Sequence, residues 1–235
     1  MRLLLLSNSR DAERRYLFHA RDAIAELLGS VRRVAFVPFA SVSASWGEYE
    51  ALVQSGLAPV GVAVASVHRA GDAAAMAAMV REAEAIVVGG GNTFHLLKVL
   101  QETGLLDVVR ERARAGVPYV GWSAGSVVAG PTIRTTNDMP VVEPPRGLGA
   151  LGLVPFQINA HFTDVHPAGF QGETRRERLE EFLAANPTLA VVGLPEGDWL
   201  DVAGAIVTLR GPHPAVLFRS GQEAAALAPD RPVAV

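Results

Sequence analysis

Residues 118–130 read PYVGWSAGSVVAG, and the organisation of the rest of the chain follows from this stretch. Its first part is apolar and β-prone, whereas its second part consists of small residues that a helix tolerates. Between them, residues 121–125 form the G-x-S-x-G pattern of a sharp turn from a strand into a helix. In such a turn the serine has strained backbone geometry, and the flanking glycines leave room for neighbouring main chain. The pattern therefore predicts Ser123 as a nucleophile exposed at the end of a strand.

Upstream of this turn, short apolar segments alternate with helical patterns. We expect strands at 3–6, 34–37, 60–67, 85–88 and 117–122, and helices at 11–28, 46–54, 73–83, 94–102 and 105–115. Strands that are apolar throughout are typical of a parallel sheet that is covered on both faces. The predicted fold class is therefore α/β, with a mostly parallel sheet and helices on both sides.

Downstream of residue 130 the pattern is looser. Residues 131–151 form a Pro- and Gly-rich segment that is long for a loop, which itself indicates a function, and we treat it as a candidate lid. A strand at 156–161, a charged helix at 173–185 and a strand at 189–194 are expected to follow, with segments 205–209 and 215–218 forming a C-terminal β-hairpin. Since no linker, low-complexity run or internal repeat interrupts the sequence, we predict a single domain over residues 1–235.

The composition limits the classes of function. A net charge of −3 argues against a nucleic-acid partner, which requires a basic surface. The absence of cysteine excludes disulfides, thiolate metal sites and a cysteine nucleophile. The apolar run near the start is too short for a signal peptide, and no run is long enough to span a membrane. We therefore expect a cytoplasmic protein without a membrane partner, and the sequence leaves open whether it forms a homo-oligomer.

Several polar residues follow predicted strands, and the carboxyl ends of parallel strands form the ligand-binding edge of a sheet. They are the turn at 89–93, Ser123, His161 and Glu196. A serine hydroxyl needs a base to become a good nucleophile, and His161 is the best placed of the six histidines. The acid that orients the base is either Asp138 or Glu196, and the residues alone do not separate the two. Each of these side chains also has a simpler interpretation as a solvated or turn-forming residue.

The three glycines at 89–91 have two interpretations. They do not match a dinucleotide fingerprint, because Phe94 stands where the third glycine is required. We favour an oxyanion-binding loop over a phosphate loop, with the N–H of Ala124 as the second donor. Nearby, His161, Asp164 and His166 have a spacing that metal sites use, but such spacing is common by chance, and we predict no metal and no cofactor.

Five blocks in the same order resemble one known family: GWSAGS, PTIRTTNDMP, FQINAHF, GETRRERL and GLPEGD. They resemble the S51 serine peptidases, the peptidase E or α-aspartyl dipeptidase family. The resemblance implies a cofactor-free exopeptidase that hydrolyses Asp-X dipeptides, with a fold similar to the flavodoxin-like class I glutamine amidotransferase domain. It also implies the following roles: Ser123 as nucleophile, His161 as base, Glu196 or Asp138 as acid, Gly91 and Ala124 as oxyanion donors, and Arg175, Asn92 and Thr93 as substrate-binding residues. We favour Glu196 as the direct partner of His161, because it comes off a strand end.

Three other functions remain open at the level of sequence. The first is a cyanophycinase-like β-aspartyl peptidase of the same superfamily. The second is an α/β-hydrolase-type esterase that uses Ser123, Asp138 and His161. The third is a non-catalytic module that binds a small ligand. The intact set of serine, histidine and acid argues against the third.

Overall fold

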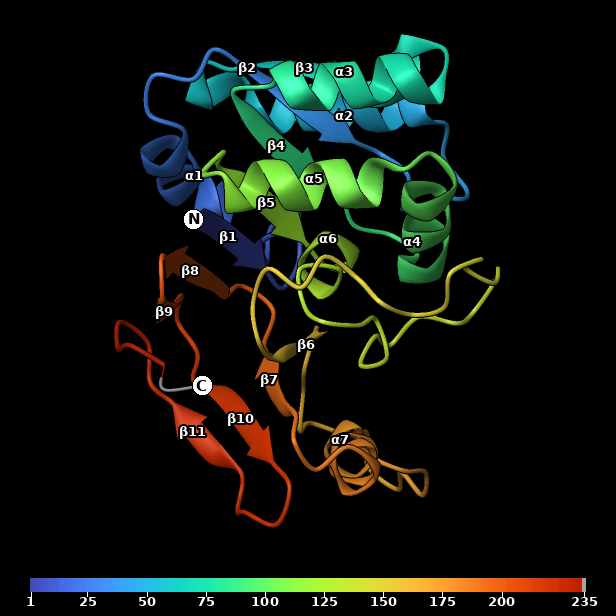
Figure 1. The fold of residues 1–235 in the computed structure, drawn as a ribbon. Coiled ribbons are helices and arrows are strands. Elements are labelled where there is room, and N and C mark those ends of the chain that lie inside the picture. Colours follow the sequence, from blue (N-terminus) through green and yellow to red (C-terminus); the bar gives the residue numbers. More distant parts are fainter. Residues whose placement is uncertain (234–235) are drawn as a thin grey trace.

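The computed structural model describes residues 1–233 and is centred on a seven-stranded sheet with the order β3-β2-β4-β5-β1-β8-β9 (Figure 1). The strands β1 to β5 run parallel to one another, and β8 and β9 join antiparallel at one edge. The bounds are β1 Arg2–Leu6, β2 Arg33–Val37, β3 Ala63–Ser66, β4 Ala85–Val88, β5 Tyr119–Trp122, β8 Trp199–Ala203 and β9 Ile206–Arg210. The predicted α/β class with a mostly parallel sheet is therefore confirmed.

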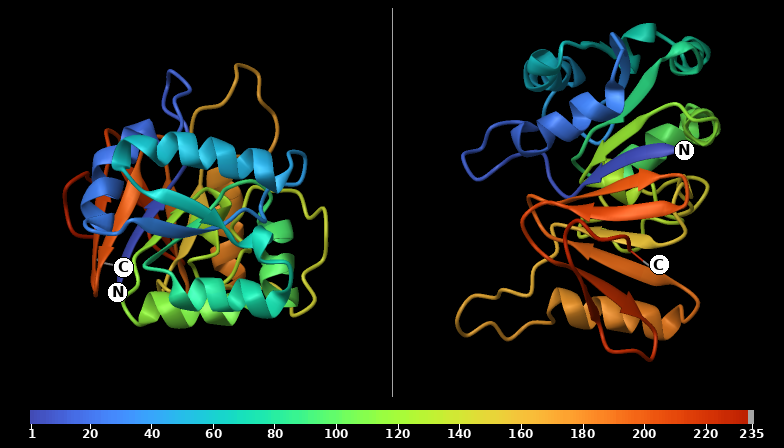
Figure 2. Two further views of the ribbon diagram at one scale, coloured as in Figure 1. Left: turned by 90° about the horizontal axis from the view of Figure 1, so that it is seen from above. Right: turned by 90° about the vertical axis from the view of Figure 1, so that its left-hand side faces the viewer.

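Helices cover both faces of this sheet (Figure 2). In β1, Leu3 and Leu5 belong to an apolar cluster with α3, α4 and α5, whereas Leu4 and Leu6 belong to a second cluster with α1 and α2. A strand buried on both sides has no polar face, which explains its uninterrupted run of leucine. The helices are α1 Arg21–Leu28, α2 Trp46–Leu57, α3 Ala73–Glu82, α4 Thr93–Glu102, α5 Leu105–Arg114 and α6 Ala124–Val127. Among residues 1–233, no helix is both long and apolar enough to cross a membrane.

A second, four-stranded sheet with the order β11-β10-β7-β6 lies beside the first (Figures 1 and 2). Its strands β6 and β7 are parallel, and β10 and β11 are antiparallel to their neighbours. The strands of this sheet are β6 Gln157–Ala160, β7 Ala190–Leu194, β10 Ala215–Arg219 and β11 Ala225–Leu227, and helix α7 Arg175–Ala185 lies between β6 and β7 in the sequence. The larger apolar cluster continues from Leu5 of the first sheet to Leu194 of the second, so one core joins the two sheets.

The helix predicted over residues 11–28 is wrong in its first half. Only α1 and a short 3₁₀ turn before it are helical, because the preceding residues form a separate turn. Asp11 accepts hydrogen bonds from the main-chain N–H of Arg15 at 2.7 Å and from its guanidinium at 2.7 Å. An Asp that bonds to nearby main chain in this way competes with helix formation. Leu17 then adopts a left-handed φ of 56°, which separates the turn from the helix.

The C-terminal strands are present but are paired differently from the predicted hairpin. The segments predicted at 205–209 and 215–218 correspond to β9 and β10, which lie in different sheets. β9 forms a hairpin with β8, a strand that we did not predict, and β10 forms one with β11. The C-terminal hairpin is therefore β10–β11.

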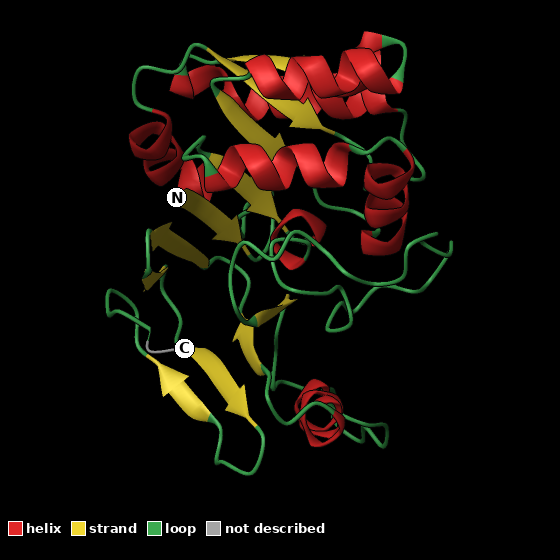
Figure 3. Cartoon of the chain, viewed as in Figure 1, coloured by secondary structure: helices red, strands yellow, loops and turns green. Residues whose placement is uncertain are grey.

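The segment between α6 and β6 contains no helix or strand (Figure 3). It is nevertheless held at several points along its length. The guanidinium of Arg110 donates to the carbonyls of Ala150 and Leu151, each at 2.9 Å, and Gln101 donates to the carbonyl of Gly147 at 2.9 Å. These contacts fix the later part of the segment against α4 and α5.

Candidate active site

The G-x-S-x-G stretch forms the turn between β5 and α6, as its sequence predicts. Ser123 has φ 51° and ψ −115°, a strained conformation for a residue with a side chain. A Cβ on Gly121 would lie against the carbonyl oxygen of Gly125, and one on Gly125 would lie against the carbonyl oxygen of Val88. Both glycines are therefore required for the main chain to fold this tightly around Ser123.

Ser123, His161 and Glu196 form one chain of hydrogen bonds. His161 Nε2 lies 2.9 Å from Ser123 Oγ, and His161 Nδ1 lies 2.6 Å from Glu196 Oε1. A carboxylate only accepts, so Nδ1 carries the proton and Nε2 is free to accept the serine proton. The sheet brings the pair together, because His161 follows β6 and Glu196 follows β7, and these strands are parallel neighbours. The main-chain N–H of His161 also donates to Ser7 Oγ at 2.8 Å.

Asp138, the alternative acid, has different partners. Its carboxylate accepts hydrogen bonds from the main-chain N–H of Thr93 at 2.8 Å, from the hydroxyl of Thr93, and from the hydroxyl of Thr136 at 3.0 Å. These bonds attach the long loop to the start of α4. Of the two carboxylates, the one that contacts His161 is thus Glu196.

The sequence predicts the main-chain amides of Gly91 and Ala124 as oxyanion donors. Within residues 1–233, the N–H groups of Gly91 and Ala124 have no hydrogen-bond acceptor. Ala124 opens α6, where the first amides of a helix have no internal partner. Gly91 has φ 137°, and a Cβ there would lie against the carbonyl oxygen of Ala40, so only glycine fits. A Cβ on the preceding Gly90 would lie 2.9 Å from Ser123 Cβ, which shows how closely this turn approaches the nucleophile.

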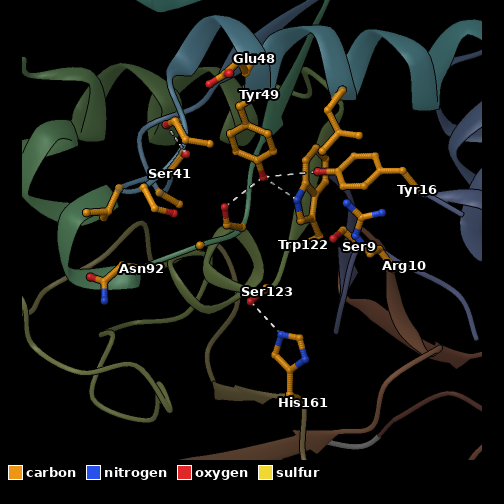
Figure 4. A pocket seen from close by; sticks show the side chains of 17 residues that line it. Ser9, Arg10, Tyr16, Ser41, Glu48, Tyr49, Asn92, Trp122, Ser123 and His161 are labelled. Carbon is orange, nitrogen blue, oxygen red and sulfur yellow. Dashed lines mark hydrogen bonds between the residues drawn. The ribbon is translucent and has the colours of Figure 1, made fainter. Parts of the chain in front are cut away.

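A cavity of about 590 Å³ opens in front of Ser123 and His161 (Figure 4). Its wall includes the glycine turn, the start of α2 and the loop after β1. Among the described residues that line it, Arg10 is the one with a permanent positive charge. The volume is in the range of small-molecule binding sites, and both Ser123 and His161 line the cavity.

The three predicted substrate-binding residues, Arg175, Asn92 and Thr93, are each hydrogen-bonded within the protein. The guanidinium of Arg175 donates to the carbonyl of His161 and does not line the cavity, and burial lowers the pKa of this guanidinium. Asn92 lines the cavity, but its side chain accepts from the main-chain N–H of His95 at 3.0 Å and donates to the carbonyl of Met139 at 2.9 Å. Thr93 is fully buried on Asp138. Asn92 and Thr93 therefore hold the start of α4 in the structure.

The sequence spacing that suggested metal ligands does not form a site. Asp164 pairs with the guanidinium of Arg176 at 2.5 Å, and His166 stacks on Phe170. Within the described part of the chain, no group of three or more His, Cys, Asp or Glu is arranged to hold a metal ion.

Two polar residues at the site were missed at the level of sequence. Ser7 directly follows β1, so it could have been found by the same rule that pointed to Ser123, namely that polar residues at the carboxyl ends of parallel strands mark the ligand-binding edge. Tyr49 has no such signal, because it lies inside a helix that is otherwise amphipathic. Tyr49 lines the cavity, and its hydroxyl donates to the carbonyl of Gly90 in the glycine turn (Figure 4).

The chain matches known proteins over almost its whole length. The family model described as peptidase family S51 matches residues 3–210. Peptidase E of Salmonella newport strain SL254 is 49% identical over 227 residues, which cover 97% of each chain. Peptidase E of Escherichia coli O1:K1 / APEC is 47% identical with the same coverage.

Two crystal structures have a similar fold. A peptidase from an acI-B1 actinobacterium matches with a TM-score of 0.73 at 16% identity, over 99% of this chain and 96% of that one. A presumed peptidase E protein from Listeria monocytogenes EGD-e matches with a TM-score of 0.66 at 21% identity, over 90% of this chain and 98% of that one. These likenesses extend across both sheets.

Proposed function

The chain belongs to peptidase family S51 and is a serine-type dipeptidase, and from this premise we propose that it hydrolyses Asp-X dipeptides with aspartate at the amino end. The observation that carries the proposal is the chain of hydrogen bonds from Ser123 through His161 to Glu196, beside two unpaired main-chain N–H groups. That arrangement has the parts that acyl transfer needs: a nucleophile, a base, an orienting acid and an oxyanion site.

The proposed reaction follows from the protonation states of these groups. His161 removes the Ser123 proton through Nε2 while Glu196 holds the proton on Nδ1 and stabilises the imidazolium that forms. Ser123 attacks the scissile carbonyl, and the N–H groups of Gly91 and Ala124 bind the oxyanion. His161 then protonates the leaving amine, and the second residue departs. Water, activated by the same histidine, releases aspartate from Ser123.

The demand for aspartate is proposed to come from an arginine. Family resemblance points to Arg175, which already contacts the main chain of the base and is partly desolvated. A desolvated guanidinium left without a carboxylate is costly, so a neutral side chain in the substrate would be rejected. Arg10 is the alternative arginine for recognition of the aspartate side chain, because it lines the cavity.

Cytoplasmic location is also a proposal. It is supported by the absence of cysteine, which is typical of proteins from reducing compartments.

The experiment compares release of the amino-terminal residue from Asp-Leu, Asn-Leu, Ala-Leu and β-Asp-Leu. We expect turnover of Asp-Leu, with kcat/KM for Asn-Leu lower by about 10²-fold or more because the guanidinium is left unpaired. Preference for the β-linked peptide would instead support a β-aspartyl peptidase. Brisk hydrolysis of p-nitrophenyl acetate without any preference for aspartate would support an esterase.

Two variants then identify the residue that recognises aspartate. Arg175→Ala is expected to lose the preference for Asp-Leu over Asn-Leu, whereas Arg10→Ala is expected to keep it. The opposite pattern would assign recognition to Arg10, and retention of the preference in both variants would refute a single arginine as its source.

A further inference from the structure

The hydroxyl of Tyr49 connects the glycine turn at residues 89–91 with Trp122, the last residue of β5 (Figure 4). It lies 3.0 Å from the carbonyl oxygen of Gly90 and 3.0 Å from Nε1 of Trp122. Gly90 directly precedes one oxyanion donor, and Trp122 directly precedes the nucleophile. The hydroxyl of Tyr16 is a third and more distant neighbour, at 3.4 Å.

The direction of each of these hydrogen bonds is fixed by the chemistry of the partners. A carbonyl oxygen only accepts, so Tyr49 must donate its one proton to Gly90. An indole N–H only donates, so Tyr49 accepts from Trp122. The hydroxyl of Tyr16 must then also donate to Tyr49. Burial raises the pKa of Tyr49, which keeps the phenol protonated, and therefore a donor, across the neutral range.

The carbonyl of Gly90 and the N–H of Gly91 belong to the same peptide unit. In a trans peptide these two groups point in opposite directions, so the orientation of one determines that of the other. Glycine on both sides leaves this peptide unit free to rotate unless something holds it. In the structure the Tyr49 hydroxyl holds this carbonyl through the hydrogen bond of 3.0 Å.

From this geometry we propose that Tyr49 is a positioning residue of the oxyanion site: by holding the Gly90 carbonyl it aims the Gly91 N–H at the reacting carbonyl of the substrate. The inference rests on the proposed function in so far as Gly91 is an oxyanion donor. Tyr49 does not itself touch the reacting atoms.

The ring of Tyr49 is held independently of its hydroxyl. It packs edge-on against Phe36 with ring centroids 5.1 Å apart, and it fills the space that a Cβ on Gly89 would need. Tyr49→Phe therefore keeps the ring in place and removes the hydroxyl alone. Tyr16→Phe is the matched control, because it removes a hydroxyl from the same network without touching the Gly90 carbonyl.

The first test measures kcat and KM of both variants on Asp-Leu. We expect kcat of Tyr49→Phe to fall by at least about 10-fold with KM within about two-fold, the signature of an interaction made in the transition state. Complete loss of an oxyanion donor costs about 10²–10³ in kcat, which sets the upper limit. Tyr16→Phe is expected to lose less. The pH profile of Tyr49→Phe should keep its shape, because Tyr49 transfers no proton.

The second test compares two ligands of the site. A boronic acid analogue of aspartate becomes tetrahedral on Ser123 and uses the oxyanion donors, whereas free aspartate does not. Tyr49→Phe is expected to weaken the boronate by about the same factor as kcat and to leave aspartate binding unchanged. Equal weakening of both ligands, or unchanged kcat, would overturn the proposal.

A third measurement separates this inference from the substrate assignment. The rate at which diisopropyl fluorophosphate modifies Ser123 depends on the oxyanion site but not on aspartate recognition. If the wild-type chain reacts with this reagent yet hydrolyses no Asp-X peptide, the proposed substrate class fails. A slower modification of Tyr49→Phe would still support the role of Tyr49, whereas an equal rate in both proteins would refute it.

Discussion

Replacing each of the two candidate acids by its amide should have opposite consequences. Glu196→Gln removes the negative charge that His161 Nδ1 faces at 2.6 Å, but keeps the size of the side chain. Asp138→Asn changes a carboxylate that is hydrogen-bonded to Thr93 and Thr136 rather than to His161. The first variant should therefore be slow but stable, and the second active but less stable.

The magnitudes follow from the hydrogen bonds that each carboxylate makes. A hydrogen bond to a charged group contributes about 1.5–3 kcal/mol, which corresponds to a fall of about 10- to 150-fold in kcat for Glu196→Gln. The Glu196 side chain is 64% exposed, so water screens its charge and the lower part of that range applies. In Asp138→Asn the amide oxygen retains part of the acceptor role, and a loss of about 1–2 kcal/mol of stability is expected. In a chain of this size that lowers Tm by about 2–8 °C.

The assay measures steady-state hydrolysis of Asp-Leu and thermal unfolding of both variants under the same buffer conditions. Ser123→Ala provides the background rate. If Asp138→Asn lost activity as strongly as Glu196→Gln without a change in Tm, Asp138 would act on the chemistry and the assignment of the acid to Glu196 would be refuted.

Three further perturbations have outcomes that the structure determines. Gly91→Ala places a methyl group against the carbonyl of Ala40 and should lower kcat by about 10²-fold or more. Gly61→Ala is the control, because Gly61 also has a positive φ but faces open space; it should cost about 1–2 kcal/mol of stability and keep activity. Ser126→Ala removes a buried hydroxyl that shares its one proton between the carbonyl oxygens of Leu6 and Gly121, at 2.7 Å and 2.9 Å, and should lower Tm by about 2–8 °C. Burial raises the pKa of Asp198 from 3.8 to about 6, so the folded chain binds this proton more tightly than the unfolded chain does. This contribution to stability is complete below about pH 4 and is lost as pH rises to about 6. Urea titrations should therefore give a free energy of unfolding for the wild-type chain that is higher at pH 4 than at pH 6 by about 2–3 kcal/mol from this group, a difference that Asp198→Asn lacks.

Much of the fold could be predicted because its strands carry a clear signal. β4 is apolar throughout, and β1 is apolar from Leu3 to Leu6; both are followed by polar or glycine-rich turns, which is how a strand buried on both faces is encoded. Where local chemistry competed with the pattern, the prediction failed. The residues after Asp11 have a helical composition, but the carboxylate bonds to nearby main chain and forms a turn instead.

The candidate site also has parts that the sequence predicts and parts that depend on contacts between distant segments. The turn around Ser123 is encoded by contiguous residues, so its geometry could be predicted from the sequence. The sequence favours Glu196 over Asp138 only because Glu196 follows a strand; the contact itself depends on β6 and β7 being neighbours in the second sheet, which the sequence does not reveal. Tyr49 contributes through a contact between a helix and a distant turn, and such a contact leaves no periodic signal in the sequence.

The measurement that tests the central claim most directly is rapid-quench analysis of the reaction with Asp-Leu, followed by mass spectrometry of the peptide that contains Ser123. An acyl-enzyme on Ser123 predicts an aspartyl adduct on that peptide in the wild-type chain, leucine release no slower than aspartate release, and neither adduct nor turnover in Ser123→Ala. Turnover that survives in Ser123→Ala, or an adduct on another residue, would contradict the account.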